Sequence, residues 1–178
     1  AKIASVTGYD EKRYWEKRAE SWNEQAQIDI VKEQKLKNII KDINFNSVLD
    51  IGCGNGRFVP YFEGKEYEGC DISEKLVKIA GERYPENKFF TSSVEDIDTK
   101  TTKTYDLVYI YTCLEHVPPE NIQKAINAIK QVSKKLLLIE PRHFQSTGDY
   151  CYDHDYNSLF NVEKEYKMGD KTAFLINL

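Results

Sequence analysis

The stretch that most constrains the fold is VLDIGCGNGRF, residues 48–58, in which a short apolar run leads into three glycines at alternate positions. The apolar run follows Asn46-Ser47 and ends at glycine, a pattern that predicts a buried strand of a parallel sheet. Glycine tolerates positive φ and lets a ligand approach the backbone, so the three glycines predict a sharp turn that carries a nucleotide-like ligand. A glycine-rich turn without a ligand is the alternative. We expect a helix from Arg57 onward.

Four further apolar stretches predict strands that alternate with helices, at 67–72, 88–91, 105–110 and 135–139. Ser73 is placed to cap a helix from Glu74 to about Tyr84, and another helix is expected to begin near Pro119, where proline suits the first turn. Two late strands, 163–168 and 172–177, could pair as a hairpin at one edge. The fold class is therefore predicted as α/β, a doubly wound, mostly parallel seven-stranded sheet with an antiparallel edge hairpin and helices on both faces.

Composition narrows the possible partners. The net charge of −4 offers no general attraction to phosphates, and the visible basic clusters, 134–135 and 100–103, look like solvated ends of elements, so nucleic acid is an unlikely partner. No apolar run approaches the length of a membrane span, so no membrane contact is expected, and residues 1–11 lack a signal-peptide pattern. A cytoplasmic location is the resulting expectation.

The four cysteines are scattered without a Cys-x-x-Cys pair, at Cys53, Cys70, Cys113 and Cys151. Three of them lie near predicted strand ends, where small apolar residues fill space. Neither a zinc site nor a disulfide framework is indicated, and we expect no bound metal.

Ligands of doubly wound sheets bind outside the carboxyl ends of the strands. Asp71 ends the second predicted strand, and a carboxylate there can accept hydrogen bonds from both ribose hydroxyls of a nucleotide. Its alternative role is that of a helix cap. A nicotinamide cofactor is disfavoured, because the dinucleotide fingerprint requires a third glycine at position 57, which is Arg57 here.

The chain resembles the small bacterial and archaeal methyltransferases of the Rossmann-like, S-adenosylmethionine-dependent class. The resemblance is carried by VLDIGCGNGRF, by the acid in EGCDIS, by YDLVYIYTCLEHVPPE and by LLLIEP, which occur in the order and spacing of that family. It covers roughly residues 45–178. We accordingly predict a single domain over 1–178, with an N-terminal helical cap over 1–44 and a Rossmann-like core over 45–178.

The resemblance implies S-adenosylmethionine as the cofactor and S-adenosylhomocysteine as its product. Carried over by motif, the methionine part would be held by Asp50, Gly52, Cys53, Gly54, Asn55 and Gly56, the ribose by Asp71 beside Ile72, the adenine edge by Ser93, Val94 and Glu95, and the sulfonium side by Tyr111. The N-terminal helix folds over the donor in relatives, so Tyr14 and Arg18 are expected to contact the donor carboxylate. The sequence departs from the family at Ser93, where relatives often have an acidic residue that accepts a hydrogen bond from the adenine amino group. Either Ser93 or Glu95 must take that role here.

A sulfonium methyl carries its own activation, so catalysis mainly requires in-line placement of the acceptor in a closed, dry pocket. A hydroxyl or protonated amine must also lose a proton, and His116 is the candidate base, although it could equally shape its loop. His143 and His154 belong to an aromatic-rich loop over 142–156 that suits an acceptor site, or a surface connection. Metal ligation by Glu115, His116 and the loop residues lacks a diagnostic spacing.

The predicted function is methyl transfer to an oxygen or nitrogen of a small-molecule acceptor. A protein or RNA methyltransferase keeps the donor and changes the target. A third possibility is a non-catalytic S-adenosylmethionine-binding module that acts through a partner. The identity of the acceptor and the oligomeric state are not encoded in residue types alone.

Overall fold

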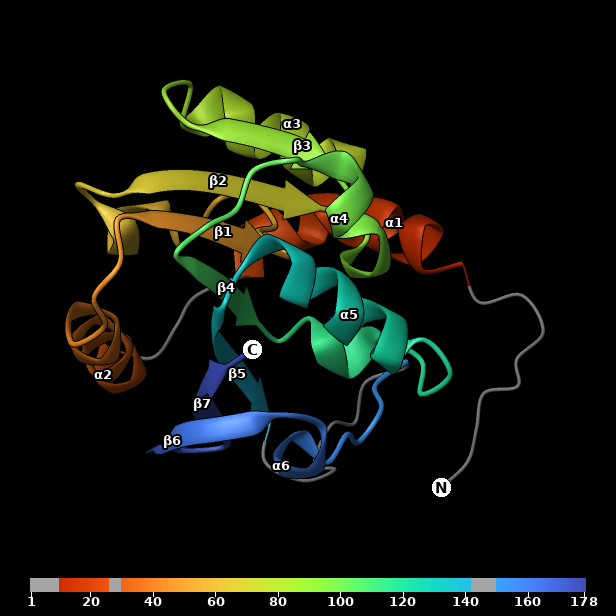
Figure 1. The fold of residues 1–178 in the computed structure, drawn as a ribbon. Helices are drawn as coiled ribbons and strands as arrows, with labels where there is room; N and C mark the ends of the chain where they lie inside the picture. The colour runs from red at the N-terminus through yellow and green to blue at the C-terminus, as the bar shows by residue number, and fades with distance from the viewer. Residues whose placement is uncertain (1–9, 26–29, 142–149) are drawn as a thin grey trace.

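The computed structural model describes residues 10–25, 30–141 and 150–178. The described chain forms an α/β structure in which helices and strands alternate (Figure 1). In chain order the elements are α1 Glu11–Gln25, α2 Ile30–Lys41, β1 Ser47–Ile51, the 3₁₀ turn η1 Val59–Phe62, β2 Glu66–Asp71, α3 Glu74–Arg83, β3 Lys88–Thr91, η2 Val94–Asp96, α4 Ile97–Lys100, β4 Leu107–Tyr111, η3 Leu114–His116, α5 Ile122–Val132, β5 Lys135–Pro141, α6 Tyr156–Leu159, β6 Asn161–Met168 and β7 Lys171–Asn177.

The seven strands form one sheet in the order β3-β2-β1-β4-β5-β7-β6. The first five are mutually parallel, whereas β7 runs antiparallel to β5 and to β6. The predicted doubly wound sheet with an antiparallel edge hairpin is therefore confirmed. Because β1 pairs with β2 on one side and with β4 on the other, the strand order reverses at β1, which is where such sheets bind their ligands.

Alternation along the strands explains why helices cover both faces. In β4, Leu107 and Tyr109 pack into a cluster with α2 and η1, whereas Val108 and Ile110 pack into a second cluster with α5 and α6. Successive residues of a strand point to opposite faces, so a strand that is apolar at every position must be covered twice. In Figure 1, α2 lies at the left and α5 to the right of β4 and β5.

Two local predictions differ from the structure. The expected helix from Arg57 is instead the 3₁₀ turn η1, because Pro60 has no N–H and its ring would clash with the carbonyl one α-turn earlier. The helix expected near Pro119 begins at Ile122, after a turn in which the Pro118 carbonyl accepts hydrogen bonds from the N–H groups of Asn121 and Ile122. Ser73 caps α3 as predicted, accepting from the Leu76 N–H.

The segment predicted as a helical cap over 1–44 contains the described helices α1 and α2, and residues 1–9 and 26–29 lie outside the described ranges. α1 is attached to the start of α3 by two contacts. The Lys12 ammonium lies 2.6 Å from a Glu74 carboxylate oxygen, and the Glu74 N–H donates to Glu16 at 2.6 Å. These contacts hold α1 across the carboxyl ends of β1 and β2, while the division into cap and core stays a prediction.

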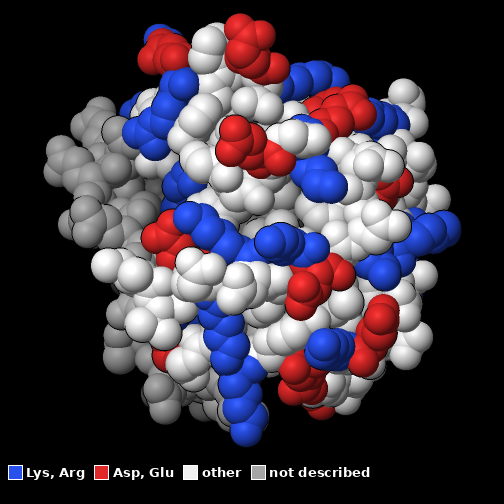
Figure 2. All heavy atoms as spheres, turned by 90° about the vertical axis from the view of Figure 1, so that its left-hand side faces the viewer, with Lys and Arg blue, Asp and Glu red and all other residues white. Residues whose placement is uncertain are grey.

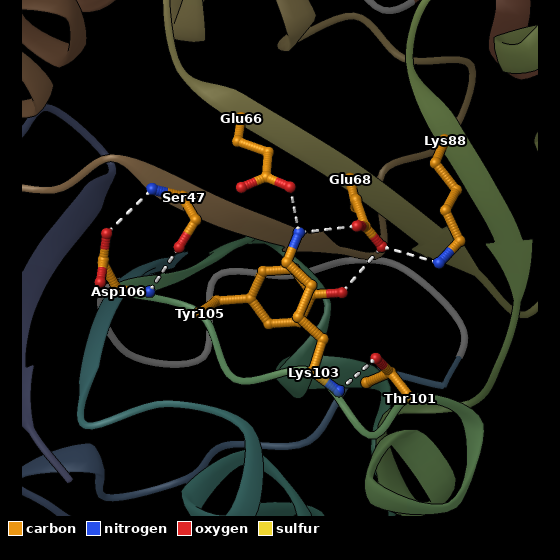
Figure 3. Close-up of polar contacts among 8 residues, drawn as sticks. All are labelled: Ser47, Glu66, Glu68, Lys88, Thr101, Lys103, Tyr105 and Asp106. Carbon is orange, nitrogen blue, oxygen red and sulfur yellow. Dashed lines mark hydrogen bonds and ion pairs between the residues drawn. The ribbon is translucent and has the colours of Figure 1, made fainter.

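The amino-terminal half of β2 carries a polar network that lies away from the turn after β1 (Figure 3). Glu68 accepts from Lys103 at 2.8 Å and from the Tyr105 hydroxyl at 2.8 Å, and the Lys88 ammonium lies 3.3 Å from it. Lys103 also donates to Glu66 at 2.6 Å. The side chain of Glu68 is only 9% exposed, so these donors satisfy a nearly buried carboxylate.

Charges of both signs mix on the face that carries α2 (Figure 2). Lys37 pairs with Glu33 along α2, and Lys32 pairs with Asp170 at the β6–β7 turn. This face therefore lacks the single-sign basic field that binds nucleic acid backbones. Among the described helices, none combines the length and apolar character needed to cross a bilayer.

Candidate active site

A cavity of about 680 Å³ opens at the carboxyl ends of β1, β2 and β4, at the reversal of strand order. Part of this volume is open to solvent. The residues that line it come from α1, the glycine turn, the starts of the loops after β2, β3 and β4, and α3: Glu11, Trp15, Ile51, Gly52, Cys53, Gly54, Asn55, Arg57, Asp71, Ile72, Leu76, Ser92, Ser93, Val94, Tyr111, Thr112, Cys113 and His116. Ten of the residues named from sequence are among these eighteen.

The glycine turn forms the floor of the cavity and requires glycine for steric reasons. Gly52 and Gly54 have φ of 78° and 55°, in the left-handed region that side chains disfavour. A Cβ on Gly52 would also lie 2.9 Å from the Cβ and sulfur of Cys113. The N–H groups of Gly52 and Cys53 both donate to the Cys70 carbonyl, so these two amides hold the turn against β2 rather than face a ligand.

Asp71 joins the turn to the end of β2. One of its carboxylate oxygens accepts from the Gly54 N–H at 2.9 Å and the other accepts from the Ser73 N–H at 2.9 Å. Burial raises the pKa of Asp71 to about 6, although these backbone donors oppose the shift. Since each carboxylate oxygen has a second lone pair, Asp71 can still accept from ligand hydroxyls. Cap-like bonding and ligand contact are thus compatible.

Asp50, predicted to hold the methionine part, lies beneath the turn and does not line the cavity. It is 1% exposed and accepts from the Tyr67 hydroxyl at 2.7 Å. Burial raises its pKa to about 7, while the Tyr67 hydroxyl and the nearby Arg57 guanidinium act in the opposite direction. Gly56, also predicted for this subsite, lies against Tyr84 instead of lining the cavity.

Arg57 is a cavity residue that the sequence analysis did not assign to the donor. Its guanidinium carbon lies 4.6 Å from the centre of the Phe58 ring and 4.9 Å from that of Tyr111. These rings hold a fixed positive charge at the rim, where a ligand carboxylate can pair with it. The signal was present in the sequence, because arginine stands where a dinucleotide site needs glycine.

The loop after β3 contributes the predicted adenine edge in part. Ser93 and Val94 line the cavity with Ile72, whereas Glu95 is not among its lining residues. The Ser93 hydroxyl donates to Asp96 at 3.2 Å. Its role as an acceptor for the adenine amino group stays a prediction.

α1 covers the cavity with residues other than the two predicted. Arg18 donates to the Tyr14 hydroxyl at 2.9 Å, and neither side chain lines the cavity. The lining residues of this helix are Glu11 and Trp15, four residues apart and therefore on one helical face. Burial raises the pKa of Glu11 to about 8, and the nearby carboxyls of Glu95 and Asp71 add to that shift.

His116 is the titratable group at the opposite wall of the cavity. Its Nδ1 lies 2.9 Å from the Tyr150 carbonyl, which can only accept, so Nδ1 carries the proton and a neutral imidazole has its lone pair on Nε2. The ring meets Trp15 edge-on at 5.0 Å. A Glu115 carboxylate oxygen lies 3.8 Å from Nε2.

The loop predicted to form the acceptor site is described only from residue 150. His143 lies outside the described residues. His154 does not line the cavity. Its Nε2 instead lies 2.9 Å from the Val117 carbonyl, and burial lowers the pKa of its imidazole. The backbone N–H of Tyr152 donates to the Glu115 carbonyl at 2.7 Å, so this segment buttresses the turn that carries His116.

Glu140, at the end of β5, supports the same turn from below. One of its oxygens accepts from the N–H groups of Cys113 and Leu114, at 3.1 Å and 2.8 Å. Glu140 is fully buried, and burial raises its pKa well above the ordinary value. Thr112, at the start of this turn, has φ of 50°, a strained value for a branched residue that these contacts sustain.

Glu115, His116 and Cys151 are the described residues that could hold a metal ion, since one ligand atom of each lies within 4.8 Å of the others. The two close approaches involve different nitrogens of the ring. Glu115 lies 3.8 Å from Nε2, whereas the Cys151 sulfur lies 3.7 Å from Nδ1. One ion would have to reorient these side chains to meet all three ligands, and the expectation of a metal-free site stays a prediction.

The cavity matches the chemistry of S-adenosylmethionine group by group. Apolar Ile72 and Val94 suit the faces of a purine, and the Asp71 carboxylate suits ribose hydroxyls. The Arg57 guanidinium suits a carboxylate. A left-handed Gly54 leaves the floor without a side chain where such a ligand would lie.

Comparison with known proteins agrees with this reading of the fold. Residues 48–135 match a family model described as a methyltransferase domain. The structure superposes on magnesium protoporphyrin IX methyltransferase from Synechocystis PCC 6803, solved with bound SAH, with a TM-score of 0.73 over 94% of this chain and 98% of that one, at 17% identity. It also superposes on an S-adenosylmethionine-dependent methyltransferase from Clostridium acetobutylicum, with a TM-score of 0.70 over 93% and 99% of the two chains, at 10% identity.

Two curated relatives are more similar in sequence. The chain is 28% identical over 124 residues to the ubiquinone biosynthesis O-methyltransferase of Bordetella avium, covering 66% of this chain and 51% of the relative. It is 34% identical over 126 residues to the phosphoethanolamine N-methyltransferase of Plasmodium falciparum, covering 66% and 45%. The chain thus spans about half the length of these relatives.

Residues 48–135 therefore form a methyltransferase domain, and the structure has the Rossmann-like fold of S-adenosylmethionine-dependent methyltransferases. The cofactor of this class is S-adenosylmethionine, and the sequence-based recognition of family and cofactor is confirmed.

Proposed function

We propose that this protein transfers the methyl group of S-adenosylmethionine to an oxygen or nitrogen of a small-molecule acceptor. The observation that carries the proposal is the placement of His116. It lines the same cavity as Asp71 and the glycine turn, with an imidazole nitrogen available to take a proton. A donor site and a base within one cavity are what transfer to a hydroxyl or amine needs.

When bound, S-adenosylmethionine supplies a methyl group activated by its sulfonium. The chain's own residues bind and orient it. Asp71 accepts from the ribose, Arg57 pairs with the carboxylate, and the glycine turn admits the methionine part. Trp15 on α1 covers the cavity beside His116, which excludes water from the reacting groups.

His116 takes the acceptor's proton on Nε2. The Tyr150 carbonyl holds Nδ1–H and so selects the tautomer that leaves Nε2 ready to accept. Once Nε2 is protonated, the Glu115 carboxylate at 3.8 Å stabilises the positive ring. The ring is held by Tyr150 and Trp15 from two directions, so its orientation is set before the acceptor arrives.

A small acceptor is favoured over a protein or RNA. The helix α1 lies over the cavity, which leaves limited room for a macromolecular target, and the chain is acidic overall. The two curated relatives are named for an O-methyltransferase and an N-methyltransferase of small molecules, which supports both kinds of acceptor atom.

The proposal is tested by incubating the protein with S-adenosylmethionine and panels of small phenols, alcohols and amines, and by measuring S-adenosylhomocysteine formation. Acceptor-dependent product supports the proposal. Tight donor binding without turnover on any panel would favour a non-catalytic module, and turnover only on protein or RNA would move the target to that class.

The role of His116 is tested by His116→Ala. As a base, its loss should lower turnover about a hundredfold while the donor dissociation constant changes little. His116→Asn is the matched control, because an amide can keep the bond to the Tyr150 carbonyl without acting as a base. Equal turnover in His116→Asn and the wild type would show that the ring only shapes the turn.

A further inference from the structure

Acidic residues outnumber basic ones in the lining of the cavity. Glu11 and Asp71 both line it, and the basic side chain among its lining residues is that of Arg57. Asp71 is satisfied by backbone N–H groups from the turn and from the start of α3. Glu11, by contrast, reaches in from a separate helix and is not part of the glycine turn.

Glu11 is held in this place by its helix rather than by its own contacts. Lys12 and Glu16 attach α1 to the start of α3, and Trp15 packs edge-on against His116. These contacts direct the first turn of α1 over the cavity. The Glu11 carboxyl therefore interacts both with Asp71, at the end of β2, and with Cys113, in the loop that leads to His116.

The titratable groups that face Glu11 are acids, of which Cys113 and Tyr152 are neutral at neutral pH. Asp71 faces it from β2, Glu95 from η2, Cys113 from the loop after β4 and Tyr152 from the segment before α6. Burial, with smaller contributions from Glu95 and Asp71, raises the pKa of the Glu11 carboxyl to about 8, so it is mostly protonated at neutral pH when no cation is near. A cation placed beside it would restore the carboxylate.

We propose, resting on the function proposed above, that Glu11 is the residue by which this cavity distinguishes the positively charged methyl donor from its neutral demethylated product. The donor carries a sulfonium charge that disappears when the methyl group leaves, while the rest of the molecule is unchanged. A carboxylate near that sulfur attracts the donor and has no such attraction for the thioether. Glu11 thereby favours donor entry and product release.

Glu11 should release a proton when the donor binds and take one up after the methyl group has left. Donor binding converts the Glu11 carboxyl to a carboxylate and releases its proton to solvent. After transfer, the cation is gone and Glu11 takes a proton back. Because a cation lowers the raised pKa of Glu11, the preference for donor over product should increase as pH rises from about 6.5 to about 8.5.

The test is calorimetric titration of the full chain with S-adenosylmethionine and with S-adenosylhomocysteine, without acceptor. In the wild type at pH 7, the donor should release protons, seen as a binding enthalpy that depends on the ionisation enthalpy of the buffer, and the product should not. Glu11→Gln should abolish that difference and lower the donor-to-product affinity ratio about tenfold. Sinefungin, which carries an amine in place of the methyl sulfonium, should behave like the donor.

Glu16→Gln is the matched control, because Glu16 lies on the same helix without lining the cavity, and the glutamine oxygen can still accept from the Glu74 N–H. It should leave the affinity ratio unchanged. An unchanged ratio in Glu11→Gln, or equal weakening of donor and product, would overturn the proposal, since Glu11 would then serve no charge-sensing role. Wild-type protein that bound neither ligand would instead refute the proposed function itself.

Discussion

The two ends of β2 place carboxylates in opposite electrostatic environments. At the amino end, burial alone would raise the pKa of Glu68, but hydrogen bonds from Lys103, Tyr105 and Lys88 outweigh it and lower that pKa (Figure 3). At the carboxyl end, burial raises the pKa of Asp71 to about 6, because only backbone N–H groups oppose it. The same strand thus carries one carboxylate completed by the protein and one that has capacity left for a ligand.

The difference teaches how a site can be told from a structural network. Both carboxylates are nearly buried and both are hydrogen-bonded, so neither burial nor bonding separates them. The presence of cationic partners does. Glu68 is satisfied by fixed ammonium groups, which suits stability, whereas Asp71 and Glu11 meet further carboxyls, which suits the binding of a cation or of hydroxyl donors.

The largest expected effect that separates the two ends is on donor binding. Asp71→Ala removes the acceptor for the ribose and leaves the Gly54 N–H without its partner, so donor affinity should fall by about 10- to 100-fold, or about 1.5–3 kcal/mol. Titration calorimetry measures it. Donor affinity equal to that of the wild type would remove Asp71 from the binding site.

The second-largest expected effect is on the stability of the protein and arises at the amino end of β2. Glu68→Ala leaves the buried Tyr105 hydroxyl and Lys103 without their shared acceptor and should lower the free energy of unfolding by about 2 kcal/mol. Urea denaturation measures the loss, and donor affinity of the folded protein should be unchanged. A parallel drop in donor affinity would show that the two ends are coupled.

The pH dependence of stability should have opposite signs at the two ends. The folded-state pKa of Asp71, about 6, lies above the ordinary value, so stability without ligand falls as pH rises from about 4 to 6, and Asp71→Asn should remove on the order of 1–2 kcal/mol of that fall. For Glu68 the pKa is lowered, so its stabilisation is present above pH about 4.5 and is lost as pH falls through the lowered pKa. Chemical denaturation of the wild type, Asp71→Asn and Glu68→Ala between about pH 3 and 7 measures both dependences, and identical slopes in Asp71→Asn and the wild type would refute the first assignment.

The smallest effect is expected for the outermost partner of Glu68. Lys88 lies 3.3 Å from it with a side chain that is 65% exposed, so Lys88→Ala should lower the free energy of unfolding by about 0.5 kcal/mol. The loss should shrink in 1 M salt, because solvent ions screen the pair. A loss as large as that of Glu68→Ala would mean that Lys88, rather than Lys103 and Tyr105, holds the network.

Much of the fold and part of the site follow from local patterns. Apolar runs bounded by turn residues predicted all seven strands, and the glycines after β1 predicted the turn, because strand burial and positive φ each demand a narrow set of residue types. Ser93, Val94 and Tyr111 were reached from motif position and do line the cavity. Asp50 was assigned by the same means, yet Tyr67 sequesters it beneath the turn.

The sequence by itself determined the succession of strands and helices along the chain and the class of ligand. Hydrophobic alternation and glycine placement specify these features because they act over a few residues. Only the tertiary structure decided which face of α1 meets the cavity, that Glu11 and Trp15 rather than Tyr14 and Arg18 line it, and that Arg57 turns inward. These outcomes depend on contacts between segments distant in the chain, such as Lys12 with Glu74 and Trp15 with His116. No local pattern encodes such contacts, since each exists only once the sheet has brought its partners together.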